Sequence, residues 1–400
     1  MAHNSDHPHL MVEKIMHDRM SPIYFFQALT IFVKSLFGVF APVYMYANGY
    51  PLYQVFLYAI LFSFAMLFII PIAVKLIRQI GFKFTMFFSV PMYMGFIIFL
   101  NYIDVSFWFA IGAWAIYGMH VGMFWPAYHS EIALSGHNKK RGSEIGTIQM
   151  ITALFATIAP IIGGYLLEFM SYMEVLILGC IILVISFGPL YFAKNIKLKK
   201  YDFNYKDYFR FIGSRKHQNS KRAFVAEGLE HSISYIGWPI FLFIILSGSY
   251  FALGTVMTVV SLISVLVIRF IKKRLDRQDK HKVLFVTSRM YTVSWIGRLI
   301  LIFIGGILTI FIESFARIMT DVFRLPYQSI FYNNAKRTQY LDYIIMREFF
   351  LACSRIISFS IFALLFALFG EGVWVIAIAV ITAAVGSLGI ANFREERTSH

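Results

Sequence analysis

Residues 52–83 read LYQVFLYAILFSFAMLFIIPIAVKLIRQIGFK, and this stretch decides the fold class. Positions 52–74 carry no charged side chain, whereas Lys75, Arg78 and Lys83 follow at once. A helix needs about 20 predominantly apolar residues to cross the hydrocarbon core of a bilayer. Basic residues gather on the cytoplasmic side of the short loops that follow such helices. The stretch therefore predicts a transmembrane helix followed by a cytoplasmic loop.

Apolar runs of this kind fill most of the 400-residue chain. Hydrophobic residues make up 59% of it and charged residues only 14%, and the mean hydropathy is +0.68. A soluble domain usually carries about 25% charged residues, because its surface must remain hydrated. We therefore expect an all-α membrane protein with twelve transmembrane helices. The runs lie near 24–46, 52–74, 84–103, 107–129, 144–168, 173–193, 223–246, 250–271, 284–304, 307–332, 341–368 and 372–392.

The loops between these runs alternate in charge. Lys and Arg occur in every second loop, including the loop at 139–141 and a long polar segment at 194–222. The intervening loops, such as those around Gly49 and Gly248, contain no Lys or Arg. Because basic residues stay on the cytoplasmic side, we expect both termini in the cytoplasm, which requires an even number of spans. We expect the membrane to be a plasma membrane or a bacterial inner membrane.

The rest of the composition argues against several other functions. Cys180 and Cys353 sit in apolar runs without a Cys or His partner at metal-ligand spacing, so neither a disulfide framework nor a metal site is expected. The sequence has no GxxxxGK[ST] phosphate loop, no HExxH and no GxSxG. Its formal net charge of +15 is distributed between the apolar runs, which argues against nucleic acid. We expect no cofactor, no metal, no nucleic-acid partner and no enzymatic activity.

The two halves of the chain share short matching segments. Leu76-Ile77-Arg78-Gln79 and Leu275-Asp276-Arg277-Gln278 lie 199 positions apart, and the two loop glycines named above have the same separation. Pro126 and Pro326 lie 200 positions apart. Parallel repeats of this kind are the plan of a large class of transporters. We expect a six-helix bundle over 1–193 with a short cytoplasmic N-terminus, a basic cytoplasmic linker at 194–222, a second six-helix bundle over 223–392 and a cytoplasmic tail at 393–400.

These segments resemble the major facilitator superfamily, and the resemblance covers essentially the whole chain. Residues 275–282, LDRQDKHK, are similar to the acidic-basic loop signature of that superfamily in its second-half copy. The first-half copy at 75–83 keeps Gly81 and a later basic residue but lacks the first Gly and the Asp. Residues 159–164, APIIGG, resemble the Pro-x-x-Gly-Gly core of a motif associated with exporters. The resemblance implies two six-helix bundles that transport a small molecule by alternating access.

Ionisable side chains inside the apolar runs are the candidates for function, because charge in a bilayer is costly unless it meets a partner or a cavity. Lys34 lies near the middle of the first run, where snorkelling to the membrane surface is disfavoured. In the superfamily that the chain resembles, helices 1, 4, 7 and 10 line the central cavity. The resemblance therefore implies a substrate site for an anionic or strongly polar group, formed by Lys34, Tyr117, His120, Tyr235, Trp238 and Arg317.

The run at 307–332 carries the most charge. Its residues Glu313, Arg317 and Asp321 recur every four positions, so they share one helix face. Glu313, or Glu230 together with His231, is a candidate to carry a proton, because burial and nearby charge tune the protonation of a carboxylate. Alternatively, the three residues of the run form an ion-pair ladder with a purely structural role.

A further group of charges falls near the expected cytoplasmic ends of the runs. Salt bridges among them would close the inner side of a transporter and would open when partners are lost. This predicted cytoplasmic gate comprises Glu131, Arg141, Glu144, Asp276, Arg277, Asp321, Arg324, Arg347 and Glu348.

The expected function is secondary transport, with proton coupling and export of amphipathic or anionic small molecules as its favoured form. Its partners would be that substrate, protons and membrane lipids, and we expect the chain to be a monomer. Because a fold does not determine a function, three alternatives stay open: a lipid-handling protein, a sensor that has lost transport, and a membrane enzyme.

Overall fold

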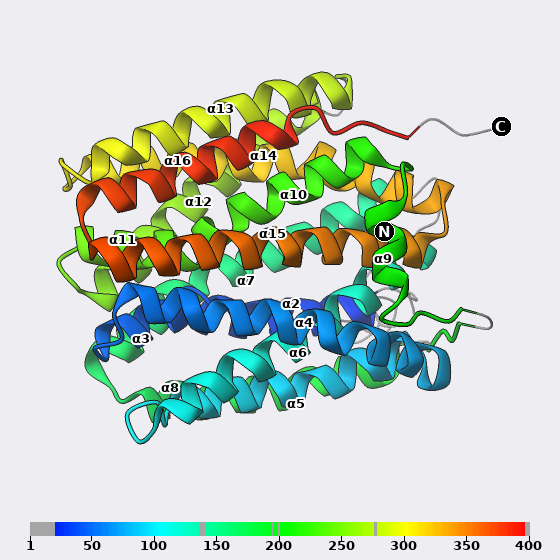
Figure 1. Cartoon of the computed structure of the whole chain (residues 1–400), viewed down its shortest axis with the longest axis horizontal. Helices are drawn as coiled ribbons and strands as arrows, with labels where there is room; N and C mark the ends of the chain where they lie inside the picture. The colour runs from blue at the N-terminus through cyan, green and yellow to red at the C-terminus, as the bar shows by residue number, and fades with distance from the viewer. Residues whose placement is uncertain (1–20, 136–140, 194, 199–200, 276–277, 397–400) are drawn as a thin grey trace, which may run out of the picture.

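A computed structural model places the chain in a bundle of long, roughly parallel helices, with no strand among the described residues (Figure 1). In chain order the helices are α2 (Ser21–Phe37), α3 (Phe40–Ala47), α4 (Leu52–Ile80), α5 (Phe82–Leu100), α6 (Phe107–Ser135), α7 (Arg141–Phe169), α8 (Tyr172–Phe192), α9 (Asp207–Gly213), α10 (Gln218–Ser232), the π-helix η1 (Ile233–Gly237), α11 (Trp238–Ile245), α12 (Tyr250–Leu275), α13 (Lys280–Leu301), α14 (Leu308–Arg337), α15 (Tyr340–Phe369) and α16 (Val373–Ile390). The structure describes residues 21–135, 141–193, 195–198, 201–275 and 278–396, apart from the side chains of 21, 24, 135, 141–152 and 272–275.

Each predicted apolar run coincides with helical structure. Within the described ranges, nine helical stretches are long and apolar enough to cross a membrane, which makes the chain an integral, multi-pass membrane protein. The described part of α7 contributes a shorter apolar stretch, Ala153–Phe169. Helices α13 and α14 are not among the nine, and the count of twelve spans stays a prediction.

Two of the predicted runs are interrupted helices, which the apolar pattern did not reveal. The first run divides into α2 and α3 around Gly38, whose amide donates to the Lys34 carbonyl oxygen at 2.6 Å. The seventh run divides into α10, η1 and α11. Such π-segments often mark functional positions, because they change which side chains face a site.

The glycines that match between the two halves have matching backbones. Gly49 has a φ of 85° and Gly248 a φ of 76°, each in the loop that follows a short helix, α3 or α11. Glycine is favoured there because a side chain is strained at positive φ. Pro126 and Pro326 both lie inside long helices, α6 and α14. The internal repeat therefore extends from sequence to local structure.

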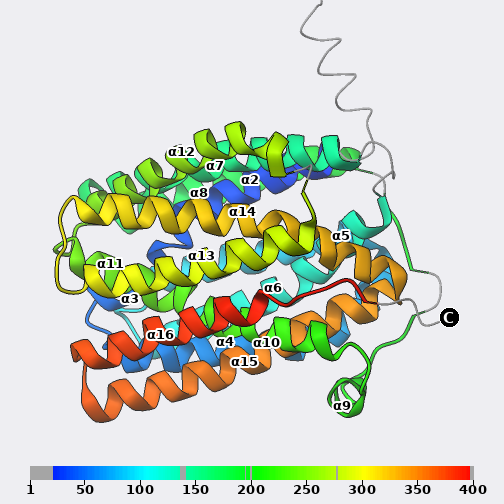
Figure 2. The ribbon, with the colours of Figure 1, turned by 90° about the horizontal axis from the view of Figure 1, so that it is seen from above.

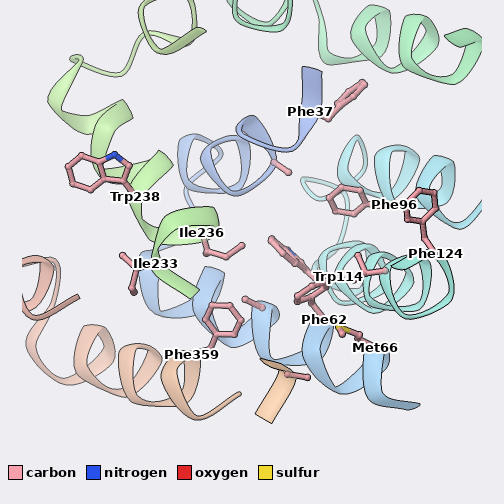
Figure 3. Packing of buried hydrophobic residues seen from close by; sticks show 14 of the residues in the cluster. Phe37, Phe62, Met66, Phe96, Trp114, Phe124, Ile233, Ile236, Trp238 and Phe359 are labelled. Atoms are coloured by element: carbon pink, nitrogen blue, oxygen red, sulfur yellow. The ribbon is translucent and has the colours of Figure 1, made fainter. Parts of the chain in front are cut away.

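The first and second parts of the chain meet along two pairs of helices. Helix α7 packs against α12, and α4 packs against α15. Figure 2 shows α7 with α2 and α12 along one side of the bundle and α4 with α15 along the opposite side. On α4, the Phe56 ring lies 5.5 Å from Phe366 and 6.0 Å from Phe359 of α15. Figure 3 shows Phe359 and Ile236 of η1 among the buried apolar side chains of the bundle interior.

The short helix α9 contacts both α4 and α15 at one end of the bundle (Figure 1). The Tyr208 hydroxyl donates to the Leu67 carbonyl of α4 at 2.8 Å, and its ring stacks on Phe349 of α15 at 4.9 Å. Arg210 pairs with Asp342 of α15 at 3.0 Å. The described end of the chain, after α16, lies at the same end of the bundle as α9 (Figure 1).

Candidate functional site

Lys34 on α2 extends its side chain between aromatic rings of α5 and α6. Its Nζ lies 3.9 Å from the centroid of Phe124, 5.1 Å from that of Trp125 and 5.9 Å from that of Tyr93. This ammonium nitrogen is buried and has no hydrogen-bond partner among the described residues. Cation–π attraction offsets part of the cost of its burial, by about 2 kcal/mol for a desolvated cation. No described carboxylate lies within ion-pair distance of Lys34.

His120 on α6 belongs to the same cluster. Its Nδ1 lies 2.8 Å from the carbonyl oxygen of Ser89 on α5 and must therefore donate a proton to it. In the neutral ring this leaves Nε2 as an acceptor, and Nε2 is buried with no partner among the described residues. The ring lies 5.0 Å from that of Tyr93 and 6.3 Å from that of Tyr117.

Further polar atoms of the first half are buried without a described partner. They include Oε1 of Gln27, on the same helix as Lys34, and the hydroxyl of Tyr93. We call Gln27, Lys34, Tyr93 and His120 the N-half polar cluster. Buried polar atoms are nearly always hydrogen-bonded, so several unsatisfied atoms in one region call for a physical reason. A bound polar solute would satisfy them, with the ammonium as donor and the imidazole nitrogen as acceptor.

Trp238 lies beside a buried ion pair that the sequence pattern did not predict. Arg298 on α13 donates from Nε and Nη2 to the two carboxylate oxygens of Glu313 on α14, at 2.7 and 2.8 Å. The Arg298 guanidinium also lies 4.7 Å from the Trp238 ring and 4.1 Å from the Trp295 ring. Trp238 therefore packs on this pair, and Glu313 is paired with Arg298 rather than with Arg317.

Glu230 and His231 lie on α10, close to a tyrosine of α13. The Tyr291 hydroxyl donates to Glu230 at 2.6 Å. The nearest described basic nitrogen to Glu230 is Nε2 of His231, at 3.8 Å. His231 lies equally far from Glu227 and accepts at Nδ1 from Arg355 at 2.8 Å. Glu230 is thus buried and stabilised chiefly by a neutral hydroxyl, unlike Glu313.

Arg317, Arg324 and Tyr235 lie in a more exposed part of the second half. Arg317 pairs with Asp321 at 3.0 Å, so the second of the two ion pairs expected along this helix face is present. Arg324 donates to the Tyr235 hydroxyl at 2.8 Å. Tyr235 is 49% exposed, so it lies outside the buried core. The predicted substrate residues therefore fall into two groups, one around Lys34 and one on η1, α11 and α14.

The predicted cytoplasmic gate is only partly described. Arg347 binds Glu227 at 2.5 Å and Glu348 at 2.6 Å, so these charges connect α15 to α10. Glu131 is buried on α6. His129 also contacts the second half, with its Nδ1 2.8 Å from the Tyr332 hydroxyl. Asp321 and Arg324 have the partners given above, and the side chains of Arg141, Glu144, Asp276 and Arg277 lie outside the described residues.

Several residues of these sites were not predictable from the sequence. Phe124 and Tyr93 were read as part of apolar runs, and only their packing places them around Lys34. Tyr291 gave no signal, because a tyrosine in an apolar run is usually a packing residue. Arg298 and Arg355 were visible as intramembrane charges, but their partners lie on other helices.

Comparison with known proteins places this geometry in a known fold. No protein-family model matches the chain, and no curated protein matches it by sequence. The structure of the Escherichia coli fucose:proton symporter FucP matches with a TM-score of 0.62 at 15% identity, covering 96% of this chain and 100% of that chain. A second structure, of FucP as a major facilitator superfamily transporter in the outward conformation, matches with a TM-score of 0.64 at 14% identity and covers 94% and 98%. The chain therefore has the fold of a major facilitator superfamily transporter over nearly its whole length, as the sequence resemblance implied.

Proposed function

We propose that this protein is a secondary transporter that works by alternating access and carries a small anionic molecule with an apolar body. The shared fold with a transporter supports secondary transport. The observation that carries the substrate class is the buried Lys34 ammonium, which has aromatic neighbours but no described hydrogen-bond partner.

The argument for an anion is electrostatic. An unpaired buried charge costs several kcal/mol, of the order of the effective desolvation penalty of a single ion. Cation–π contacts with Phe124 and Trp125 return only part of that cost. A carboxylate bound at Lys34 would supply the missing acceptor, and the same rings would cover an apolar or aromatic substrate body. The His120 Nε2 lone pair would accept from a donor group on that substrate.

Proton coupling is assigned to Glu230 with His231, rather than to Glu313. Glu313 is held by a bidentate pair with Arg298, which favours its ionised form in a fixed geometry. Glu230 instead accepts from Tyr291, and its nearest described basic group is the His231 imidazole rather than a permanently charged guanidinium. A small rearrangement of α10 and η1 would change the environment of both groups.

Alternating access requires two units that move against each other, and we assign them to the helices before and after the 194–222 linker. We also assign α7, α13 and α14 as spans, which brings the count to twelve with both termini in the cytoplasm. Their charges do not oppose this, because Arg298 and Glu313 neutralise each other inside the bundle. At 29, 22 and 30 residues, all three exceed the roughly 20 that a span needs.

The outer ends of the two units are joined by two carboxylates in matching positions. Glu168, at the end of α7, accepts from the Tyr250 amide at 2.8 Å at the start of α12. Glu371, after α15, accepts from the Leu52 amide at 3.0 Å at the start of α4. A carboxylate at a helix N-terminus is favourable because unpaired amides and the helix dipole both attract it. We assign these two contacts as the outer closure of the transport cycle.

Efflux is the proposed direction, on the strength of the 159–164 segment. In the structure, a side chain added at Gly163 would meet the Leu36 carbonyl of α2, and one added at Gly164 would meet the Tyr250 carbonyl of α12. The segment therefore lets α7 pack closely against α2 of its own unit and α12 of the other unit. Transport measured from both sides of oriented vesicles tests the direction.

Ligand binding provides the first test. Purified protein is heated with a panel of aromatic and aliphatic monocarboxylates and with their uncharged amides. We expect only carboxylates to raise the melting temperature, Lys34→Met to abolish that effect, and Lys34→Arg to keep part of it. Arg289→Gln, a matched change on the exposed face of α13, should leave it unchanged. Equal stabilisation by the amides, or a full effect in Lys34→Met, would rule out this site.

Proton coupling is tested in proteoliposomes with a carboxylate identified by that panel. We expect Glu230→Gln to abolish transport driven by a pH gradient while substrate exchange without a gradient continues. Loss of both would show a structural role for Glu230, and retention of both would rule out its role in coupling.

A further inference from the structure

A shallow groove opens on the side of the bundle between α9, α10, α15 and α16. Its volume is about 390 Å³, and it is lined by Ile212 of α9, residues of α10 from Gln218 to Leu229, Phe350 of α15, and Val385 and Gly389 of α16. The groove lies outside the Lys34 and Glu230 sites and has no role in the transport cycle proposed above.

The polarity of the groove changes along α10. Its end nearest α9 has Gln218, Lys221 and Arg222, whereas one to two turns further along it has Val225 and Leu229. No acidic residue is among its described lining. The distance from residue 218 to residue 229 along a helix is about 16 Å at 1.5 Å per residue. The groove is therefore cationic at one end and apolar over the rest of its length.

The two cations at the polar end have different roles. The Lys221 ammonium is buried and donates to the Phe211 carbonyl at 2.7 Å, so it fixes the end of α9. Arg222 is exposed and makes no hydrogen bond or ion pair within the described residues. Its guanidinium is the group available to an anion, and it can form the bidentate contact with a phosphate that a lysine cannot.

The apolar end continues into surface that faces the bilayer. On α16, Ile381, Val385 and Leu388 are about half exposed and share one helix face. At the polar end of the groove, Phe209 and Ile212 of α9 are 74% and 61% exposed. Exposed apolar side chains beside basic residues are typical of a helix at the membrane interface.

We propose that this groove binds one anionic phospholipid, with its phosphate on Arg222 and an acyl chain along Val225, Leu229 and Val385. The exposed Arg222 guanidinium at one end and the apolar lining beyond it correspond to the charged headgroup and the apolar chain of such a lipid. Basic pockets of this kind on the cytoplasmic side of a helix bundle select anionic headgroups.

Native mass spectrometry of protein from nanodiscs tests the site. Wild-type protein is expected to keep one phosphatidylglycerol more tightly than phosphatidylcholine when collisional activation is raised. Arg222→Gln should remove that preference by deleting the phosphate contact, and Val385→Trp should lower retention of both lipids by filling the groove. Arg289→Gln, a cation on the exposed face of α13, is the matched control and should behave as wild type.

Either of two results would overturn the proposal: equal retention of the two lipids by wild-type protein, or unchanged retention in both groove variants. Inorganic phosphate added at a large excess should not displace the lipid, since the acyl chain supplies part of the binding. Displacement would show that only a phosphate site exists. Because Arg222 and Val385 lie away from the N-half polar cluster, carboxylate binding should be unaffected in both variants. This separates failure of the lipid site from failure of the proposed transport function.

Discussion

Replacement of Glu313 by Gln separates a structural acid from a proton carrier. Glu313 is 3% exposed and accepts two hydrogen bonds from the Arg298 guanidinium, at 2.7 and 2.8 Å. A glutamine keeps the size of the side chain but removes its charge, and it can accept at only one of the two positions. The change therefore leaves a buried guanidinium without its counter-charge.

The expected cost is large. Breaking a buried ion pair by removing one partner typically destabilises a protein by about 3–5 kcal/mol. The rings of Trp238 and Trp295 lie within 5 Å of Arg298 but contact it before and after the change, so they do not compensate. Replacing both partners with apolar residues of similar volume is often neutral. We therefore expect Arg298→Met/Glu313→Leu to recover most of the stability that Glu313→Gln loses.

The assay is denaturant-induced unfolding in detergent at fixed pH. Carboxylate transport is measured on the same preparations. Asp104→Asn, a charge removal on an exposed loop, is the control and should change stability by less than about 0.5 kcal/mol. The reasoning would be refuted by a Glu313→Gln protein that is as stable as wild type and has lost only the pH dependence of transport. A double variant no more stable than the single one would refute the ion-pair argument.

Three further predictions concern helix ends and close packing. Removing either carboxylate of the outer closure, in Glu371→Ala or Glu168→Ala, should accelerate hydrogen exchange roughly fivefold at the start of α4 or α12 respectively, as expected for the loss of a cap of about 1 kcal/mol. Gly254→Val should cost about 1–3 kcal/mol in denaturant unfolding, because a Cβ there would lie 2.2 Å from a carbonyl oxygen of α7. The His217 imidazole, with its Nδ1 3.5 Å from the carboxylate, holds the pKa of Glu396 below its ordinary value of 4.5. Docking of the tail is therefore stabilised above about pH 4.5 and weakened as the pH falls below it. Hydrogen exchange of the tail, corrected for intrinsic rates, should rise there in wild type but not in Glu396→Gln.

Each of these has an outcome that contradicts it. Unchanged exchange at both helix starts would mean that the two glutamates do not close the outer side. A cost for Gly254→Val no larger than that for Gly188→Ala, which faces open space, would mean that α7 and α12 separate freely. A tail whose exchange does not change between pH 7 and pH 4 would place its stability in other contacts.

The helical fold was predictable because its cause is local. A run of apolar residues as long as 52–74 must bury its backbone polar groups by its own hydrogen bonds, whatever lies beside it. The resemblance to the major facilitator superfamily rested on short loop segments, and the matching solved structures confirm it at the level of the fold. The breaks at Gly38 and at Ile233–Gly237 were not predictable, since an interrupted run keeps the same composition as a continuous one.

The candidate sites were predictable only as a set of residues. Lys34, His120, Glu230 and Glu313 stood out because charge or an imidazole in an apolar run is rare and expensive. Their pairing was not contained in the sequence. Spacing suggested that Glu313 pairs with Arg317 one turn away, whereas it pairs with Arg298 on α13.

By itself, then, the sequence determined that the chain crosses a membrane, which stretches of it are helical, and which side chains are energetically unfavourable inside the bilayer. The tertiary structure alone decided which of those buried charges have a compensating partner. Arg298 finds a carboxylate, Arg347 finds two, and Lys34 finds aromatic rings and no described acceptor. The reason is that helix formation depends on neighbours within four residues, whereas compensation of a buried charge depends on which helices pack together.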